Sequence, residues 1–113
     1  MHGSQRILDR VGICDIMIRG TTPTHTFEVP FDTGTIDELE IQYVQGRNIL
    51  LTKVKDDCVL TENIIRTDLT QEETLRFKEG YATVQLRVSR QGIVMACKPF
   101  VMPVGRCLGT VPI

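Results

Sequence analysis

The sequence predicts an all-β fold, an immunoglobulin-like antiparallel β-sandwich of seven or eight strands with one short helical turn near residues 70–77. Two observations carry this prediction. Apolar and polar side chains alternate along several short segments, which is the pattern of strands with one face in a core and one face in water. Turn residues separate these segments at regular intervals, as in a two-sheet sandwich. A small β-barrel is the alternative closure of the same strands.

The length of 113 residues suits a single domain over residues 1–113. We expect a flexible N-terminus at residues 1–12 and an apolar C-terminal tail at residues 99–113. Because the chain has no Trp and only 5% aromatic residues, Ile, Leu and Val must fill most of the core.

The first half of the chain contains four predicted strands. Short strands are expected at Cys14–Arg19 and His25–Phe31. Glu38–Gln45 alternates cleanly, and Asn48–Lys55 follows it after a tight Gly-Arg turn, so these two segments predict a hairpin. One face of the first hairpin strand is expected to hold Leu39, Ile41 and Tyr43.

The second half contains the helical turn and the clearest strand. Cys58–Leu60 and Ile64–Leu69 are predicted to pair. Thr70–Phe77 begins with Thr and has Glu three positions later, a capping-box pattern that marks a helix start. This turn lies where immunoglobulin-like domains cross from strand E to strand F. Tyr81–Arg90 is the strongest strand and Ile93–Val101 returns beside it. The expected inward residues of the strongest strand are Ala82, Val84, Leu86 and Val88.

The charge balance excludes several classes of partner. Thirteen basic and 14 acidic residues give a formal charge of −1, without the basic stripe of a nucleic-acid binder. Such a chain also has little attraction to anionic membranes, and it contains no apolar run of the roughly 20 residues that a membrane span needs. The N-terminus lacks the apolar core of a secretory signal, so we expect synthesis in a cytoplasm.

Four cysteines, Cys14, Cys58, Cys97 and Cys107, allow three disulfide pairings. Without a secretory signal, reduced thiols are favoured, although the sequence leaves the pairing open. The spacing contains no CxxC pair, which argues against a zinc site. Cys58 and Cys97 lie in apolar strand patterns and are expected to act as small core residues.

No pattern of residues indicates catalysis. His25 falls on the same face as Phe27, so either it is partly buried with a partner or the strand begins after it. A structural histidine is expected, since no nucleophile pairs with it. No metal is expected, because Asp32, Asp37 and Glu38 lack the spacing of a calcium loop. Tyr43 and Tyr81 could stack on a sugar, but core or rim positions fit them better. We therefore expect no cofactor and no small-molecule substrate.

The C-terminal tail, Pro99–Ile113, is apolar with one basic and no acidic residue. Such a tail either packs on its own domain or docks onto a neighbouring subunit. Because Pro99 and Pro103 cannot donate a ladder hydrogen bond, the tail is expected at a sheet edge or outside the sheet. The residues predicted to contact a partner are Pro99, Phe100, Val101, Met102, Val104 and Leu108.

Four segments carry a resemblance: RGTTPTHTFEVPFD (Arg19–Asp32), ELEIQYVQ (Glu38–Gln45), LTQEETLRF (Leu69–Phe77) and VQLRVSRQG (Val84–Gly92). Together they resemble small proteins of the tail and structural modules of phages and prophages of Gram-positive bacteria. They are also similar to the immunoglobulin-like N-terminal domain of siphophage baseplate upper proteins. The resemblance implies a non-catalytic virion protein that is oligomeric and contacts other phage structural proteins or itself. Baseplate upper proteins continue into long helical regions, whereas this sequence ends after the sandwich.

Two other function classes stay open. A carbohydrate-binding module for cell-surface polysaccharide predicts a shallow groove with an exposed Tyr43 or Tyr81 beside carboxylates or amides. An enzyme requires His25 to meet a carboxylate or a thiol in a concave pocket. The sequence leaves the partner, the oligomeric state and the sheet order open.

Overall fold

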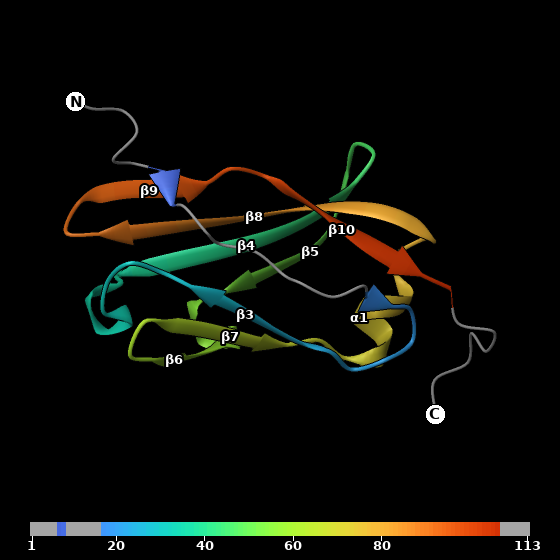
Figure 1. The fold of residues 1–113 in the computed structure, drawn as a ribbon, viewed down its shortest axis with the longest axis horizontal. Coiled ribbons are helices and arrows are strands. Elements are labelled where there is room, and N and C mark those ends of the chain that lie inside the picture. Colours follow the sequence, from blue (N-terminus) through green and yellow to red (C-terminus); the bar gives the residue numbers. More distant parts are fainter. Residues whose placement is uncertain (1–6, 9–16, 107–113) are drawn as a thin grey trace.

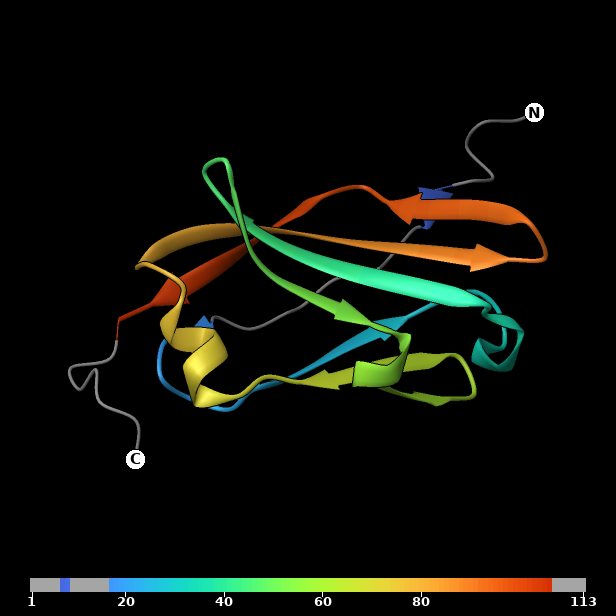
Figure 2. The same cartoon turned by 180° about the vertical axis from the view of Figure 1, so that it is seen from behind.

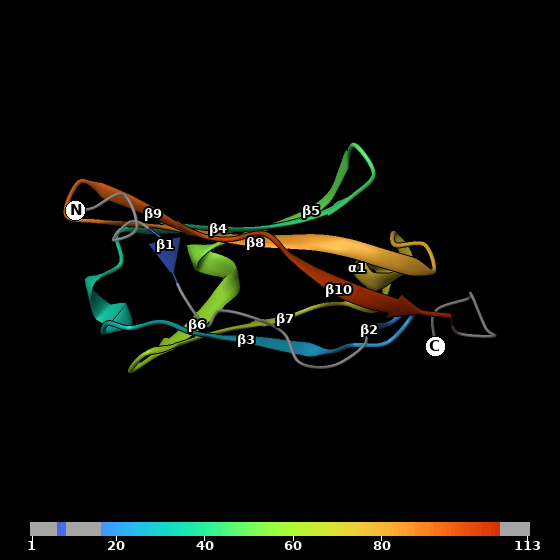
Figure 3. The same cartoon turned by 45° about the horizontal axis from the view of Figure 1, so that its top comes forward.

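Two β-sheets face each other in the described part of the chain, residues 7–8 and 17–106 of the computed structural model (Figure 1). Figure 3 shows the two layers, with the short helix α1 (Gln71–Leu75) at one end. The larger sheet has seven strands and the smaller sheet has three. The predicted all-β class is confirmed.

The larger sheet is built around its longest strand, β8. β4 pairs antiparallel along one side of β8, and β5 lies beyond β4 at the edge. On the other side of β8, β9 and β10 pair antiparallel with successive parts of the strand, and β1 and β2 add short parallel pairs to them. The strands are β1 (Ile7–Leu8), β2 (Met17–Ile18), β4 (Glu38–Gln45), β5 (Asn48–Val54), β8 (Gly80–Arg90), β9 (Ile93–Cys97) and β10 (Phe100–Gly105).

The smaller sheet is antiparallel, with the order β3-β7-β6. Its strands are β3 (Thr24–Glu28), β6 (Cys58–Thr61) and β7 (Ile64–Asp68). Short 3-10 turns connect the two sheets: η2 (Thr33–Thr35) leads from β3 toward β4, and η3 (Lys55–Asp57) leads from β5 to β6. Figure 2 shows these crossings from behind.

The core lies between the sheets and consists mostly of aliphatic side chains. The predicted inward faces of β4 and β8 are confirmed, because every residue expected there is at most 4% exposed. Tyr43 packs edge-on against Phe77, with the ring centroids 5.9 Å apart. Phe27 of β3 meets Phe100 of β10 across the core, at 6.3 Å.

The predicted helical turn is confirmed with its cap. The Thr70 hydroxyl accepts a hydrogen bond from the Glu73 N–H at 3.2 Å, and the Glu73 carboxylate accepts one from the Thr70 N–H at 2.9 Å. Both bonds satisfy amides that have no partner inside the first turn of a helix.

The predicted last strand, Ile93–Val101, is in fact two strands, β9 and β10. The break falls at Lys98 and Pro99, because proline cannot donate to the ladder. Beyond this break the tail re-enters the sheet beside β8 instead of leaving it, and β2 flanks its far end. β1 was not predicted; the rest of the N-terminus expected to be flexible, residues 1–6 and 9–12, lies outside the described residues.

Candidate functional site

Residues 19–21, the Arg-Gly-Thr stretch at the start of the first quoted segment, lie against the end of α1. The Arg19 guanidinium donates hydrogen bonds from Nε to the carbonyl oxygen of Phe77 and from Nη2 to that of Leu75, the second at 3.3 Å. Carbonyl groups at a helix end have no partner within the helix, so an arginine that reaches them from another segment satisfies them. Arg19 therefore joins the segment after β2 to the turn before β8.

Thr74 extends the same contact. Its side chain is completely buried, and its hydroxyl accepts from the Gly20 N–H at 3.0 Å and donates to the Thr21 carbonyl oxygen at 2.9 Å. A backbone hydrogen bond from the Leu69 N–H to the Pro23 carbonyl oxygen, 3.0 Å long, adds to the contacts between these two segments. The two quoted segments Arg19–Asp32 and Leu69–Phe77 thus contact each other, which gives them a structural role.

We expect the change Arg19→Met to lower the free energy of unfolding by about 1–3 kcal/mol, because it leaves half-buried carbonyl groups without a donor. Urea unfolding followed by circular dichroism measures the effect. Arg66→Met is the matched control, since Arg66 is exposed on β7. An Arg19→Met midpoint equal to that of the control would contradict this structural role.

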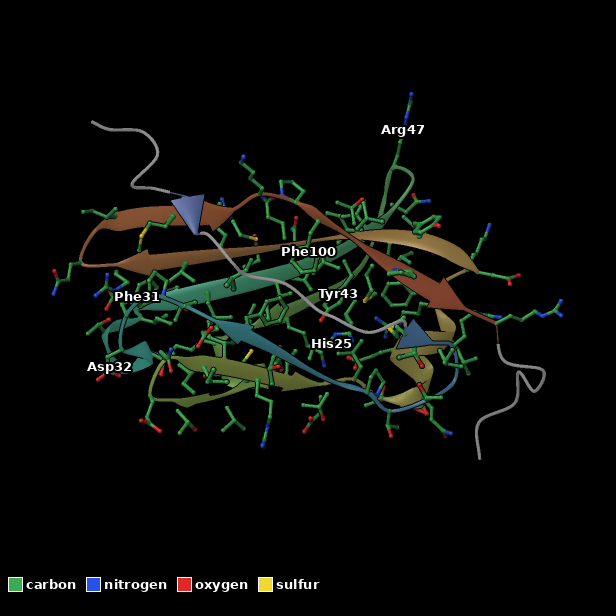
Figure 4. The ribbon with its side chains drawn as sticks, viewed as in Figure 1. His25, Phe31, Asp32, Tyr43, Arg47 and Phe100 are labelled. Carbon is green, nitrogen blue, oxygen red and sulfur yellow. The ribbon has the colours of Figure 1, made fainter. Side chains whose placement is uncertain are left out.

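His25 and Tyr43 form a buried polar pair between the sheets, and Figure 4 shows both side chains in the interior. The His25 ring is 3% exposed and its Nδ1 lies 2.7 Å from the Tyr43 hydroxyl oxygen. Burial lowers the pKa of His25 to about 4, so the ring is neutral near pH 7. Burial raises the pKa of Tyr43 far above its ordinary value, and so do the negative charges that Cys58 and Glu73 would carry at the high pH where a phenol titrates. Tyr43 therefore keeps its proton.

This geometry supports the predicted structural role of His25. Among the described residues, Tyr43 is the side chain that hydrogen-bonds the ring, and no carboxylate or thiol does so. To act as a general base, the imidazole would have to reach a nucleophile or a water molecule. The His25 ring is buried and its side-chain partner is a phenol, so it reaches neither a nucleophile nor solvent.

Lys53 and Glu73 form a second buried polar pair. Lys53 points inward from β5, is 8% exposed, and its Nζ lies 2.9 and 3.0 Å from the two carboxylate oxygens of Glu73. Burial alone raises the pKa of Glu73, but the Thr70 N–H and the Lys53 ammonium outweigh burial and lower it below its ordinary value. The charged pair thus ties β5 to the first turn of α1.

Cys58 and Cys97 are free thiols, and Cys97 is buried as predicted. Cys97 Sγ accepts a hydrogen bond from the Leu86 N–H at 3.2 Å, and Cys58 Sγ donates to the Val54 carbonyl oxygen at 3.4 Å. Burial raises the pKa of both thiols, which keeps them protonated and unreactive. Cys14 and Cys107 lie outside the described residues.

Two of the three acidic residues considered for a calcium loop hold turns instead, and the third, Glu38, is the first residue of β4. Asp32 accepts the Gly34 N–H and Asp37 accepts the Gln91 N–H, both at 2.8 Å. Within residues 7–8 and 17–106, no cluster of three or more His, Cys, Asp or Glu side chains could hold a metal ion. No helix in the same ranges has the length and apolar character of a membrane span.

The predicted partner-binding residues of the tail differ in their exposure. Met102 and Val104 are 0% and 3% exposed, so their prediction as contact residues is wrong. They pack inward because β10 pairs with β8 in a register that places them opposite Ala82 and Gly80. The half-buried Phe100 packs on Phe27, whereas Pro99 and Val101 are exposed and Leu108 lies outside the described residues.

Exposed apolar side chains gather instead on the outer face of the larger sheet. Ile49 and Val101 are each 59% exposed and Tyr81 is 71% exposed. The strand register brings them close together. In one row across the sheet, Ile49 of β5, Val44 of β4, Thr83 of β8 and Val101 of β10 lie opposite one another in turn. In the neighbouring row, Tyr81 of β8 lies opposite Pro103 of β10. We call this surface the outer apolar patch; it consists of Val44, Ile49, Tyr81, Val101 and Pro103. The β4–β5 hairpin, which carries Val44 and Ile49, bends away from the smaller sheet (Figure 3), with Arg47 at its tip (Figure 4).

Comparisons with known proteins bear on the fold alone. A scan against protein-family models and a search of curated proteins each found no match. Among solved structures, the X-ray structure of the endo-beta-1,4-mannanase from Thermotoga petrophila matches 83% of this chain with a TM-score of 0.59 and 19% identity. The chain spans 18% of the length of that enzyme, so the likeness concerns a small part of it.

Proposed function

We propose that this chain is a non-catalytic, immunoglobulin-like interaction domain of a phage or prophage virion, associated with the tail or baseplate, which acts through protein–protein contacts. The observation that carries the proposal is the outer apolar patch, because a cluster of large exposed apolar side chains on a soluble domain marks an interaction surface. The virion assignment follows from the resemblance of the four quoted segments.

The strand order supports the immunoglobulin-like part of the proposal. β3, β7 and β6 correspond to strands B, E and D, and β4, β8 and β9–β10 correspond to C, F and G. β5 then takes the place of the additional strand C′ of variable-type domains. α1 lies between β7 and β8, at the E-to-F crossing.

The chemistry of the outer apolar patch suits a protein partner. A Tyr ring supplies a large contact area and one hydrogen-bonding group, and Tyr is enriched among the residues that dominate binding energy. Val101, on the adjacent strand, is the more exposed of the two residues that the sequence-predicted tail contributes to this surface, the other being Pro103. A standard interface of about 800 Å² per partner would cover the patch and its polar surroundings.

Static light scattering over a range of protein concentrations tests the proposal for self-contact. We expect the wild-type mass to rise with concentration, and we expect the double variant Tyr81→Ser/Val101→Ser to stay at the mass of one chain. Val59→Ser is the control, because Val59 is 49% exposed on β6 of the other sheet. A wild-type protein that is monomeric up to about 1 mM, the range of the weakest specific complexes, would contradict self-contact.

The neighbouring genes test the virion assignment separately. Genes for a tail tube, a tape measure or a baseplate beside this one would support it. A neighbourhood of metabolic genes would contradict it.

A further inference from the structure

A second surface lies on the same outer face, beyond the outer apolar patch. Two hollows of about 310 and 200 Å³ open there, and both are lined by Glu40 and Arg87. Because they share these residues, they lie side by side on this face, and we call the two hollows together the polar trough. Its lining side chains on the outer face are Glu38, Glu40, Gln42, Val54, Gln85, Arg87, Ser89 and Val94.

The strand register places the polar side chains of this trough in successive rows along β4 and β8. On β4 and β8, Glu38 lies opposite Ser89, Glu40 opposite Arg87, and Gln42 opposite Gln85. Three such rows extend over about 14 Å along the strands, and the two strands are about 4.8 Å apart. This linear arrangement of polar groups suits a linear chain that runs parallel to the strands better than a compact ligand.

Some polar side chains of the trough are hydrogen-bonded to other residues of the domain, and others are available to a ligand. Arg87 Nη2 donates to Glu40 Oε1 at 3.0 Å, and Gln85 Nε2 donates to the Cys97 carbonyl oxygen at 2.9 Å, which fixes both side chains. Within the described part of the chain, the side chains of Glu38, Gln42 and Ser89 hydrogen-bond no other residue. Donors and acceptors are therefore available at both ends of the trough.

The lining selects among ligand classes. Two carboxylates against one guanidinium disfavour phosphates and other polyanions. A protein interface centred here would bury Glu38 without a partner and strip water from the Glu40–Arg87 pair, and charged residues are depleted from interface centres for this reason. A sugar hydroxyl both donates and accepts, so it can satisfy carboxylate, amide and guanidinium groups in turn. The exposed Val54 and Val94 offer apolar contacts for the C–H faces of a sugar ring.

We propose that the polar trough on β4 and β8 binds a segment of a neutral, linear polysaccharide. This inference goes beyond the proposed function, because it rests on residues outside the outer apolar patch. A domain of this kind would hold a glycan on one part of the sheet and a protein on the other.

Isothermal titration calorimetry tests the inference with cellohexaose, N-acetylchitohexaose and hexagalacturonic acid. We expect saturable binding of at least one neutral oligomer and weaker binding of the anionic one. Gln42→Ala and Arg87→Ala should each weaken that binding at least about tenfold, which corresponds to 1.4 kcal/mol. Arg66→Ala is the matched control, since it removes an exposed Arg from the outer face of the other sheet.

Both trough variants should keep the wild-type unfolding midpoint, because the Arg87–Glu40 pair is solvent-exposed and such pairs contribute little stability. The absence of saturable binding of either neutral oligomer up to about 10 mM, a range weaker than ordinary specific affinities, would overturn the inference. Preferential binding of the anionic oligomer, or binding that both trough variants retain, would also overturn it. Light scattering on Tyr81→Ser/Val101→Ser reports on the protein contact independently, so the two proposals can fail separately.

Discussion

The change Glu73→Gln is expected to lower the free energy of unfolding by about 3 kcal/mol. It leaves the Lys53 ammonium buried without an opposite charge, and the loss of one partner of a buried ion pair costs roughly 3–5 kcal/mol. We place the effect at the lower end because the two side chains keep 10% and 17% of their surface in water. Urea unfolding measures it.

Gln is chosen because it can still accept the Thr70 N–H and complete the capping box. The change therefore removes the charge and keeps the cap. Thr70→Ala is the complementary control, because it removes the cap hydroxyl and leaves the ion pair; we expect it to cost about 1 kcal/mol. Equal costs for Glu73→Gln and Thr70→Ala would contradict a dominant role of the charge.

Lys53→Met tests the other side of the pair. Met fills a similar volume and leaves Glu73 bonded to the Thr70 N–H, so we expect a smaller loss than for Glu73→Gln. The double variant Lys53→Met/Glu73→Gln contains neither charge, and we expect it to be more stable than Glu73→Gln alone. A double variant whose loss equals the sum of the single losses would show that the two residues do not interact.

The sequence predicted the strands whose two faces differ clearly. β4 and β8 alternate without interruption, and their buried residues follow the alternation. α1 was predicted from its capping box, a local pattern that needs no tertiary information. These elements could be predicted because the residues within each element are sufficient to specify its secondary structure.

Lys53 and β10 show why other features could not be predicted. Lys53 points inward only because Glu73, twenty positions away, meets it. The tail joins the sheet because β8 has a free side along Gly80–Val84, which an apolar composition alone does not reveal. For this reason Met102 and Val104 were predicted as contact residues although they belong to the core. The outer apolar patch was not predicted, because its residues are brought together by the register of strands that lie far apart in the sequence.

The domain should lose about 3 kcal/mol of stability as the pH falls from above 7 to about 4. The pKa of His25 is about 4 in the folded protein and 6.5 in an unfolded chain. Between these values the unfolded chain binds the proton and the folded protein does not, so stability decreases as the pH decreases. Each unit of difference corresponds to about 1.4 kcal/mol, and the loss is complete below the folded pKa. Urea midpoints at a series of pH values measure it.

His25→Gln should flatten this dependence, because Gln can hydrogen-bond Tyr43 but does not titrate. Tyr43→Phe keeps the titrating ring and removes its partner, so it should lower stability by about 1–3 kcal/mol throughout the pH range. Glu73 acts in a different window: its folded pKa is lowered, so its contribution is lost only as the pH falls below the ordinary value of 4.5. A His25→Gln variant that still loses the wild-type amount between pH 6.5 and pH 4 would show that another group causes the change.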